Sequence, residues 1–335
     1  MQDSHISLAH GNGGRYMREL IEELFARHLG NPHLDIQADA VSLPLSREGD
    51  LLFTTDGFTV QPLEFPGGDI GSLAVHGTTN DLAVSGAIPR YLSLNAFIEE
   101  GFEIPRLERI IRSIAEAAKA IDVQVVAGDT KVVRRGEGGG LYLATTGIGI
   151  RQAGLELSMK KIRRDDHILV SGPVGDHGIA VMLAREQFGL RGELRSDAAS
   201  VLPLTRALLD LPGLRFMRDP TRGGLATVAH EISRATQMGI SLTLPVIPVR
   251  EEVVSVCEML GYDPLYLACE GRVVAILEAA DAETALERWR ALPEGESAAL
   301  IGRVAEGEPF VVIETELGGS RILEELEDDP LPRIC

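Results

Sequence analysis

Helical and strand patterns alternate along the whole of this 335-residue chain, in two successive series. In the first series, apolar spacing predicts helices over 15–29, 71–85 and 105–121, and strands over 51–55, 123–127 and 141–150. The glycine run 136–140 is predicted to be a flexible hairpin connection between the last two strands.

The second series starts near residue 155. Strands are predicted over 167–171, 240–244, 272–277 and 309–313, and helices over 178–188, 223–236, 251–260 and 282–291. Interleaved elements of this kind are typical of an α/β or α+β pair of domains. We therefore expect domains at 1–155 and 156–325, followed by an extended C-terminal tail at 326–335.

The charge balance excludes several classes of partner. Acidic residues number 50 against 32 Lys plus Arg, for a net charge of −18. Such an acidic chain is unsuited to nucleic acid or an anionic membrane surface. If the ligand carries phosphate, the negative charge of both must be neutralised, and a divalent cation held by carboxylates would do that.

The three cysteines, Cys257, Cys269 and Cys335, form no CxxC pair. An odd count without such a pair favours a reducing compartment over a disulfide scaffold or a zinc knuckle. Cys257 and Cys269 stand in apolar settings, and we expect them to be buried and inert. No signal-peptide pattern and no apolar run long enough to cross a membrane is found, so a soluble, cytoplasmic protein is predicted.

Cys335 ends the chain on a tail spaced by Pro330 and Pro332. Both prolines disfavour helix at the preceding residue, so the tail is expected to be extended. A terminal thiol on such a tail can be carried to a chemical site and withdrawn again. The alternative is a frayed terminus that happens to end in cysteine.

An aspartate next to small residues recurs at the ends of apolar runs. These aspartates are Asp39, Asp56, Asp81 and Asp129, and a fifth, Asp219, precedes a helix. Any one of them is most simply a turn or cap residue. Five together favour a site for Mg²⁺, which binds one or two carboxylates together with phosphate oxygens.

Glycine clusters at 10–14 and 172–178 expose backbone N–H groups that can cradle phosphate. A third pair, Gly223 and Gly224, opens a helix beside Arg222, and a helix N-terminus favours anions. Neither a P-loop nor a GxGxxG motif is found, and ordinary turns remain the alternative for each cluster.

The eight histidines show no metal-ligand spacing. His10 and His177, inside the glycine loops, are the candidates for a functional role. His76 and His230 lie in helical stretches, and we expect them to be polar groups with satisfied hydrogen bonds.

The segments LAHGNGG, TTDGF, TTNDLAVSGA, VVAGDTKVV, RDPTRGGLA, ACEGR and the terminal PRIC together resemble the hydrogenase-maturation HypE family, the carbamoyl dehydratases. That family belongs to the superfamily of aminoimidazole ribonucleotide synthetase (PurM-like), selenophosphate synthetase and thiamine-monophosphate kinase. The resemblance implies a homodimer whose N-terminal α/β halves form a β-barrel-like interface that frames the ATP sites, with a second α/β domain closing each site.

The resemblance also implies the reaction and its partners. A carbamoyltransferase, HypF in this family, places a carbamoyl group on the terminal cysteine. ATP then dehydrates the thiocarbamate to a thiocyanate. The cyanide passes to iron on a HypC–HypD complex, for the [NiFe] hydrogenase centre.

The resemblance assigns roles to particular residues. Cys335 becomes the carrier thiol, Glu270 the acidic residue that faces the tail and a candidate base, and Lys131 a group that stabilises negative charge. Mg²⁺ and the ATP phosphates are assigned to Asp39, Asp56, Asp81 and Asp219. The rest of the nucleotide site is assigned to Asn80, Asp129 and Lys131. From the glycine clusters described above, the phosphate-cradling candidates are Gly11, Gly13, Arg222 and Gly223.

Other functions stay open at this point. One is another ATP-using member of the superfamily, such as selenophosphate synthetase, which carries its reactive Cys and Lys near the N-terminus. Residues 8–14 here contain neither. The others are a non-catalytic scaffold that binds nucleotide and displays Cys335, and a metabolic enzyme whose terminal cysteine is accidental.

Overall fold

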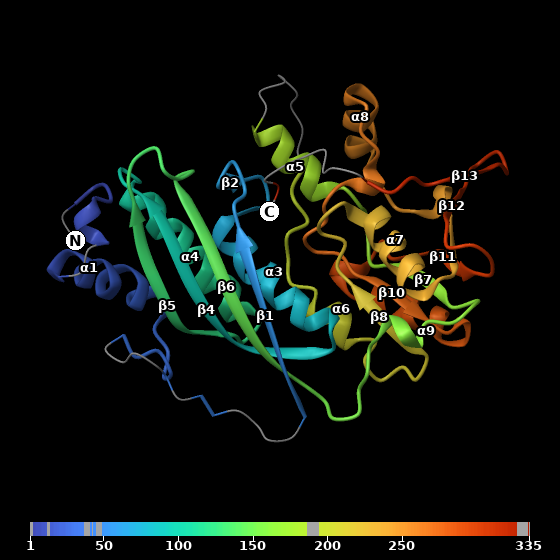
Figure 1. Ribbon diagram of the computed structural model, residues 1–335, viewed down its shortest axis with the longest axis horizontal. Coiled ribbons are helices and arrows are strands. Elements are labelled where there is room, and N and C mark those ends of the chain that lie inside the picture. The colour runs from blue at the N-terminus through green and yellow to red at the C-terminus, as the bar shows by residue number, and fades with distance from the viewer. Residues whose placement is uncertain are drawn as a thin grey trace.

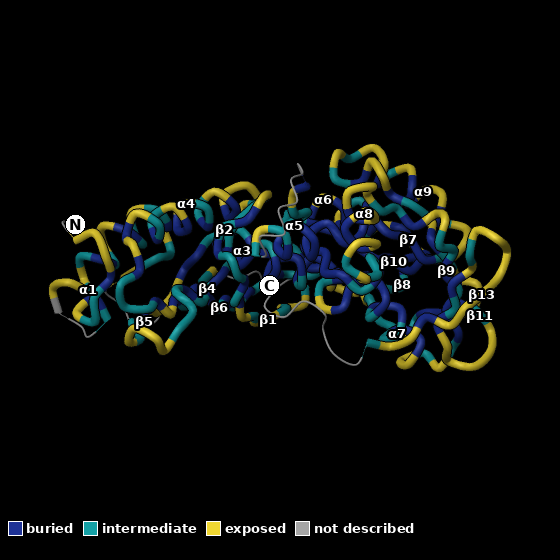
Figure 2. The backbone as a smooth tube through the Cα atoms, turned by 90° about the horizontal axis from the view of Figure 1, so that it is seen from above, coloured by how far each residue is buried: buried dark blue, intermediate teal, exposed yellow. Residues whose placement is uncertain are grey.

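The computed structural model describes residues 3–11, 14–36, 41, 43–44, 49–185, 194–326 and 334. The chain forms two lobes side by side, each built on its own β-sheet (Figure 1). Buried segments run through the middle of both lobes, while exposed segments lie mainly on the outer loops and helices (Figure 2). The mixed α/β architecture predicted from the alternating pattern is confirmed.

The N-terminal lobe starts with one continuous helical stretch, as predicted for 15–29. It consists of α1 (Gly14–Leu20), a π-helical segment (Ile21–Ala26) and α2 (Arg27–Leu29). The other elements are β1 (Asp50–Phe58), β2 (Glu64–Phe65), β3 (Gly68–Asp69), α3 (Ile70–Val84), β4 (Ala87–Glu99), α4 (Ile104–Ala120), β5 (Gln124–Val133) and β6 (Leu141–Arg151). The main sheet has the order β1-β6-β4-β5.

The two faces of this sheet differ. Alternate residues of the strands pack with α3 and α4 into the apolar core of the lobe. The opposite face is open in the chain and carries large apolar side chains. Leu51 is 57% exposed, Phe53 is 66% exposed and Phe97 is 40% exposed. An open apolar face of this kind marks a surface for association.

In this lobe one strand was missed and one prediction is wrong. Strand β4 was not predicted, although it is the central partner of β5 and β6. The run 136–140 is not a hairpin connection, because β4 lies between the two strands that it joins. This loop is instead held by Glu99, whose carboxylate accepts hydrogen bonds from the N–H groups of Gly136 at 2.6 Å and Gly140 at 2.9 Å.

The C-terminal lobe contains a seven-stranded sheet with the order β13-β12-β9-β11-β7-β10-β8. Its strands are β7 (His167–Val170), β8 (Leu214–Arg218), β9 (Gly239–Thr243), β10 (Val274–Leu277), β11 (Ala299–Ala305), β12 (Val311–Glu314) and β13 (Ser320–Ile322). Its helices are α5 (Asp176–Arg185), α6 (Leu202–Arg206), α7 (Gly224–Thr236), α8 (Glu251–Leu260) and α9 (Ala279–Arg290). Strands β8, β11 and β13 and helix α6 were not predicted.

Helix α7 packs with one face of this sheet, and α6 and α9 pack with part of the other around the buried Trp289. Helix α3 of the N-terminal lobe contacts both α6 and β8, so it joins the two lobes. Among the described residues, no helix is long and apolar enough to cross a membrane.

Candidate functional site

The last turns of helix α3 place Asn80 and Asp81 at the junction of the lobes. Asp69 caps the start of the helix by accepting hydrogen bonds from Gly71 N at 2.7 Å and Ser72 N at 3.0 Å. A Cβ atom at Gly77 would lie 2.8 Å from the Phe58 ring, so glycine lets α3 approach β1 closely. In the last turns of α3, Asp81 accepts a hydrogen bond from Thr54 Oγ1 of β1 at 3.0 Å.

Four acidic side chains lie close enough to repel one another. They are Asp56 of β1, Asp81 of α3, Asp219 directly after β8, and Glu270 in the loop before β10. Burial raises the pKa of each carboxyl group, and the neighbouring acidic groups raise the pKa values of Asp81, Asp219 and Glu270 further.

The two deepest members of this carboxylate cluster show the largest effects. The pKa of Asp219 rises to about 7. Glu270 is 2% exposed, and its pKa rises well above its usual value. Glu270 Oε1 is buried and has no hydrogen-bond partner among the described residues. A buried carboxyl group with a raised pKa and an oxygen without a hydrogen-bond partner is a candidate functional group, because such groups cluster at functional sites.

The start of α7 supplies positive charge beside the carboxylate cluster. The Arg222 guanidinium lowers the pKa values of Asp56 and Asp81 in opposition to their burial. Gly223 and Gly224 have φ angles of 67° and 61°, in the left-handed region that glycine adopts readily. A Cβ atom at Gly224 would lie 2.5 Å from Leu267 O, so the close approach of this turn requires glycine.

Asn80 lies one residue before Asp81 but points its amide into the protein. Its Oδ1 accepts a hydrogen bond from Val201 N at 2.9 Å. Its Nδ2 donates to Ala199 O at 3.0 Å and to the backbone oxygen of Glu270 at 3.1 Å. Asn80 therefore joins α3 to the loop that carries Glu270, a role that sequence reasoning did not identify.

Asp197 is a second supporting residue that was missed. Its carboxylate accepts hydrogen bonds from Glu270 N at 3.1 Å and Gly271 N at 3.4 Å, and it lies 3.4 Å from Arg272 Nε. The backbone N–H groups of Glu270 and of the next residue, Gly271, are thereby held in place. No motif marks Asp197, because its partners are more than seventy positions away.

Lys131 and Asp129 lie elsewhere. They form an ion pair of 2.9 Å on β5, at the opposite edge of the sheet from β1, and both side chains are exposed. Asp56 faces α3, whereas Asp129 and Lys131 lie on the open face, opposite Asn95 and Phe97 of β4. Within a single chain, Lys131 therefore does not lie beside Glu270.

Gly11 belongs to this second edge of the sheet. A Cβ atom there would lie 2.6 Å from Val132 Cβ, so the glycine packs tightly against β5. The predicted strand ends are also corrected: β1 continues through Asp56, β5 continues through Lys131, and Asp81 lies within a helix.

Three predicted residues, Asp39, Gly13 and Cys335, lie outside the described residues. Ile334 is described and is 3% exposed, and its carbonyl oxygen accepts a hydrogen bond from His177 Nε2 at 2.7 Å.

The other histidines differ from expectation in one respect. His10 is buried, and its Nδ1 accepts a hydrogen bond from Ser7 N at 3.0 Å. The prediction that His76 and His230 are satisfied is wrong, because His76 Nδ1 and His230 Nε2 are buried without a hydrogen-bond partner among the described residues. Cys257 and Cys269 are buried, as predicted.

No three His, Cys, Asp or Glu side chains in the described part of the chain are placed to hold a metal ion together. The predicted ligand set is therefore not a closed protein cage. Mg²⁺ does not need one, because it retains water and binds phosphate oxygens beside one or two carboxylates. The desolvated, mutually repelling carboxylates at Asp56, Asp81 and Asp219 fit an ion of that kind.

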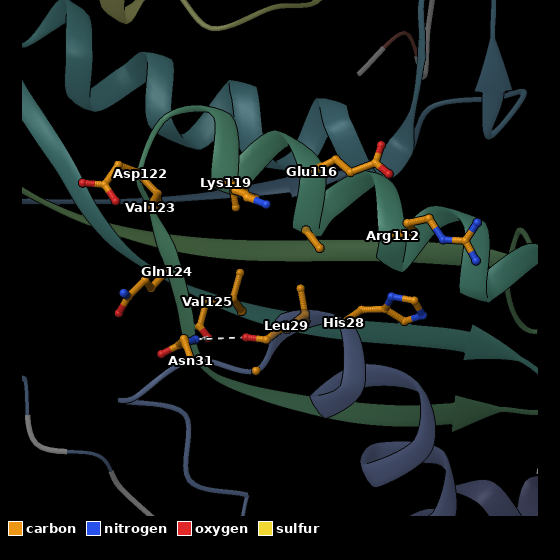
Figure 3. Close-up of a pocket in the computed structure, with 13 residues that line it drawn as sticks. His28, Leu29, Asn31, Arg112, Glu116, Lys119, Asp122, Val123, Gln124 and Val125 are labelled. Atoms are coloured by element: carbon orange, nitrogen blue, oxygen red, sulfur yellow. Dashed lines mark hydrogen bonds between the residues drawn. The ribbon is translucent and has the colours of Figure 1, made fainter.

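A separate hollow of about 330 Å³ lies between α2, α4 and the start of β5 (Figure 3). Arg112, Glu116 and Lys119 of α4 line one side, and Asn31, whose Nδ2 donates to Leu29 O at 3.0 Å, lines another. None of the carboxylate cluster lines this hollow, so it is not part of the candidate site.

Comparison with known families defines the class of protein. Residues 37–151 match the N-terminal domain of AIR synthase related proteins, and residues 163–314 match the C-terminal domain of the same proteins. The two-lobed fold, with acidic residues at the junction of the lobes, is thus that of an AIR synthase related protein.

Individual relatives narrow this class. The chain is 47% identical over 337 residues to a carbamoyl dehydratase HypE of Azotobacter vinelandii, covering 100% of this chain and 98% of that protein. A structure of hydrogenase maturation protein HypE in complex with ATP has a TM-score of 0.94 and 44% identity, covering 98% of this chain and 99% of the other. A HypE–HypF complex structure has a TM-score of 0.81 and 44% identity, covering 92% and 99%. This chain belongs to the carbamoyl dehydratase HypE family, and the predicted family and two-domain α/β fold of a single chain are confirmed.

Proposed function

We propose that this chain uses ATP to dehydrate an S-carbamoyl group on Cys335 to a thiocyanate. The γ-phosphoryl group of ATP is transferred to the carbamoyl oxygen. The carbon–oxygen bond then breaks, the oxygen leaves in inorganic phosphate, and the nitrogen loses both protons as the C≡N bond forms. The observation that carries the proposal is the buried carboxyl group of Glu270 among three further carboxylates, with its Oε1 lacking a hydrogen-bond partner among the described residues.

ATP and Mg²⁺ are the proposed cosubstrate and cofactor. Support comes from the similar HypE structure in complex with ATP and from the acidic site that one chain places at the junction of its lobes. Asp56, Asp81 and Asp219 would hold the ion, which neutralises phosphate charge and raises the reactivity of the γ-phosphoryl group. Arg222 and the start of α7 supply further positive charge beside them.

Glu270 is the proposed base that removes a proton from the carbamoyl nitrogen. Burial and the neighbouring carboxylates raise the pKa of Glu270 well above its usual value. A bound cation that neutralises the neighbouring carboxylates would lower this pKa and so favour the ionised form that acts as a base. The hydrogen bonds of Asn80 and Asp197 fix the backbone of Glu270 and thereby help to orient its side chain.

A homodimer is proposed to complete the site. Strands β1 and β5 are the two edges of the N-terminal sheet, and the open face beside them is apolar. Under twofold symmetry, β1 of one chain can pair with β5 of the other at both seams, which closes two four-stranded sheets into a barrel. Adjacent strands lie about 4.8 Å apart, so this pairing would bring β5 of the partner subunit, the strand that carries Lys131, next to β1.

Further partners follow from the family. HypF is the proposed source of the carbamoyl group, supported by the similar structure of a HypE–HypF complex. A HypC–HypD complex is the proposed acceptor of the cyanide for the iron of [NiFe] hydrogenase. The cytoplasmic location remains a prediction from the sequence.

Phosphate release tests the function against a non-catalytic scaffold. Purified protein with a carbamoylated tail should release phosphate from ATP in a single turnover, one equivalent for each thiocyanate formed. The unmodified protein and the carbamoyl-loaded Glu270→Gln variant should release far less. Equal release by the loaded and unloaded protein would show that ATP turnover is not coupled to the tail.

A further inference from the structure

His177 connects the body of the protein to the end of the tail. The residue lies in the first turn of α5 and its side chain is fully buried. Its Nε2 donates to Ile334 O at 2.7 Å, and Ile334 is the residue joined directly to Cys335. A carbonyl oxygen can only accept, so Nε2 must carry the proton.

Ser196 fixes this arrangement of the ring. Its Oγ accepts a hydrogen bond from Ala198 N at 3.0 Å and lies 2.8 Å from His177 Nδ1. The serine hydroxyl therefore donates to Nδ1, which leaves the proton of the neutral ring on Nε2. Burial lowers the pKa of His177, which agrees with a neutral imidazole.

The contact is more than one hydrogen bond. Ile334 is 3% exposed and packs in the same apolar core as Phe65. The Phe65 ring packs edge-on against the His177 ring, with centroids 5.5 Å apart and planes at 88°. Apolar burial of the Ile334 side chain and a specific donor to its carbonyl together define one seat for the end of the tail.

This seat adjoins the support of Glu270. Ser196 holds the His177 ring, and the next residue, Asp197, accepts the hydrogen bonds from Glu270 N and Gly271 N. Two consecutive residues therefore fix both the ring that binds the tail and the backbone of the proposed base. All of these groups belong to the same chain.

We propose that His177 is a positioning residue that seats the tail on its own chain for dehydration, through the Nε2–H donated to the Ile334 carbonyl. The inference rests on the proposed dehydration of the Cys335 adduct. Among the described residues, the hydrogen bond to the Ile334 carbonyl and the burial of the Ile334 side chain define this seat. His177 acts on the placement of the tail and takes no part in the bond changes.

The test compares His177→Phe, which keeps a ring beside Phe65 but removes the donor, with His177→Gln, whose amide can still donate. Each variant is measured as the full-length protein, with His167→Phe in the same lobe as the control. In the absence of ATP, the reaction rate of Cys335 with a maleimide reports release of the tail. With a preloaded carbamoyl group and ATP, single-turnover mass spectrometry reports dehydration.

The loss of one buried hydrogen bond predicts that His177→Phe raises the maleimide rate and lowers the dehydration rate, each by roughly three- to tenfold. The ATP concentration for half-maximal rate should not change, and His177→Gln should recover part of both effects. Ser196→Ala, which frees the ring tautomer, should change both rates in the same direction as His177→Phe and serves if that variant does not fold.

Wild-type rates in both His177→Phe assays would overturn the proposal, and so would equal slowing by Phe and Gln. Failure of the wild-type protein to dehydrate its adduct would instead overturn the proposed function. In that case the maleimide comparison still tests the contact, because it needs neither ATP nor the carbamoyl group.

Discussion

The side-chain amide of Asn80 donates a hydrogen bond to the backbone oxygen of Glu270 across 3.1 Å. This bond joins the last turns of α3 in the N-terminal lobe to the loop before β10 in the C-terminal lobe. Asp81, the next residue along α3, instead lies in the carboxylate cluster. Asn80 therefore stabilises the junction of the lobes, whereas Asp81 belongs to the candidate site. Substitutions at each position can test these two roles separately.

Asn80→Ala should destabilise the fold. The change removes three hydrogen bonds, and backbone groups of the part-buried Ala199 and the buried Val201 and Glu270 lose that partner. The expected loss is roughly 2–4 kcal/mol in the free energy of unfolding, because each unsatisfied buried group costs about 1–3 kcal/mol and neighbours relax in part. Urea unfolding measures it, and an unchanged midpoint would contradict the assigned role.

Asp81→Asn should leave the fold intact and weaken nucleotide binding. Burial and repulsion raise the pKa of Asp81, so loss of its charge should not destabilise the protein without ligand. Affinity for Mg-ATP should fall by roughly tenfold or more, about 1.4 kcal/mol per factor of ten. Calorimetric titration measures this, with Asp50→Asn at the exposed start of β1 as the control. Equal affinity of the two variants would remove Asp81 from the site.

Mixing two inactive variants tests whether Lys131 acts across a dimer. Lys131→Ala and Glu270→Gln should each let the carbamoyl adduct accumulate. If Lys131 of the partner subunit completes each site, a mixed dimer of these variants contains one intact site. Exchange of subunits should then restore about one quarter of wild-type activity, since half of the dimers are mixed under twofold assembly. No recovery after verified exchange would place the pair in one chain or remove Lys131 from the reaction.

His76 should make stability depend on pH. Desolvation lowers the pKa of His76 to about 4 in the folded protein, against the ordinary histidine value of 6.5 in the unfolded chain. Above pH 6.5 neither state binds the proton, so His76 has no effect. Between pH 6.5 and 4 the unfolded chain takes up the proton and the folded chain does not. Stability therefore falls by up to about 1.4 kcal/mol per pH unit.

Replacement of His76 by Gln should flatten this part of the profile. Urea unfolding at pH 7.5, 6 and 5 gives the slope for wild type and variant, and His5→Gln at an exposed position is the control. A slope identical in His76→Gln and wild type would show that His76 is not the group responsible.

Much of the fold follows from local pattern. The predicted helix at 251–260 is α8, and the prediction at 71–85 differs from α3 by one residue at each end. Strand β4 was missed because Pro89 and a register shift between Pro89 and Tyr91 interrupt its alternation. Charged residues at both Arg215 and Arg218 conceal β8 in the same way.

Four residues of the candidate site, Asp56, Asp81, Asp219 and Glu270, were named from the sequence, but their arrangement was not predictable. Alternation along β5 puts Asp129 and Lys131 on one face, but only the order of the strands shows that this face is opposite to that of Asp56. The supports of Glu270 depend on contacts between distant segments, which no local pattern contains. His177 was singled out from its glycine loop, yet its partner Ile334 could only be found in the folded structure.

The most direct test of the account is mass spectrometry of the C-terminal peptide. The protein is incubated with HypF, carbamoyl phosphate and ATP, and then with Mg-ATP alone. We expect the adduct on Cys335 to appear as a carbamoyl group and then to lose one water in an ATP-dependent step, with neither species on Cys335→Ala. A carbamoyl adduct that persists unchanged in the presence of Mg-ATP, or one that forms equally on Cys335→Ala, would contradict it.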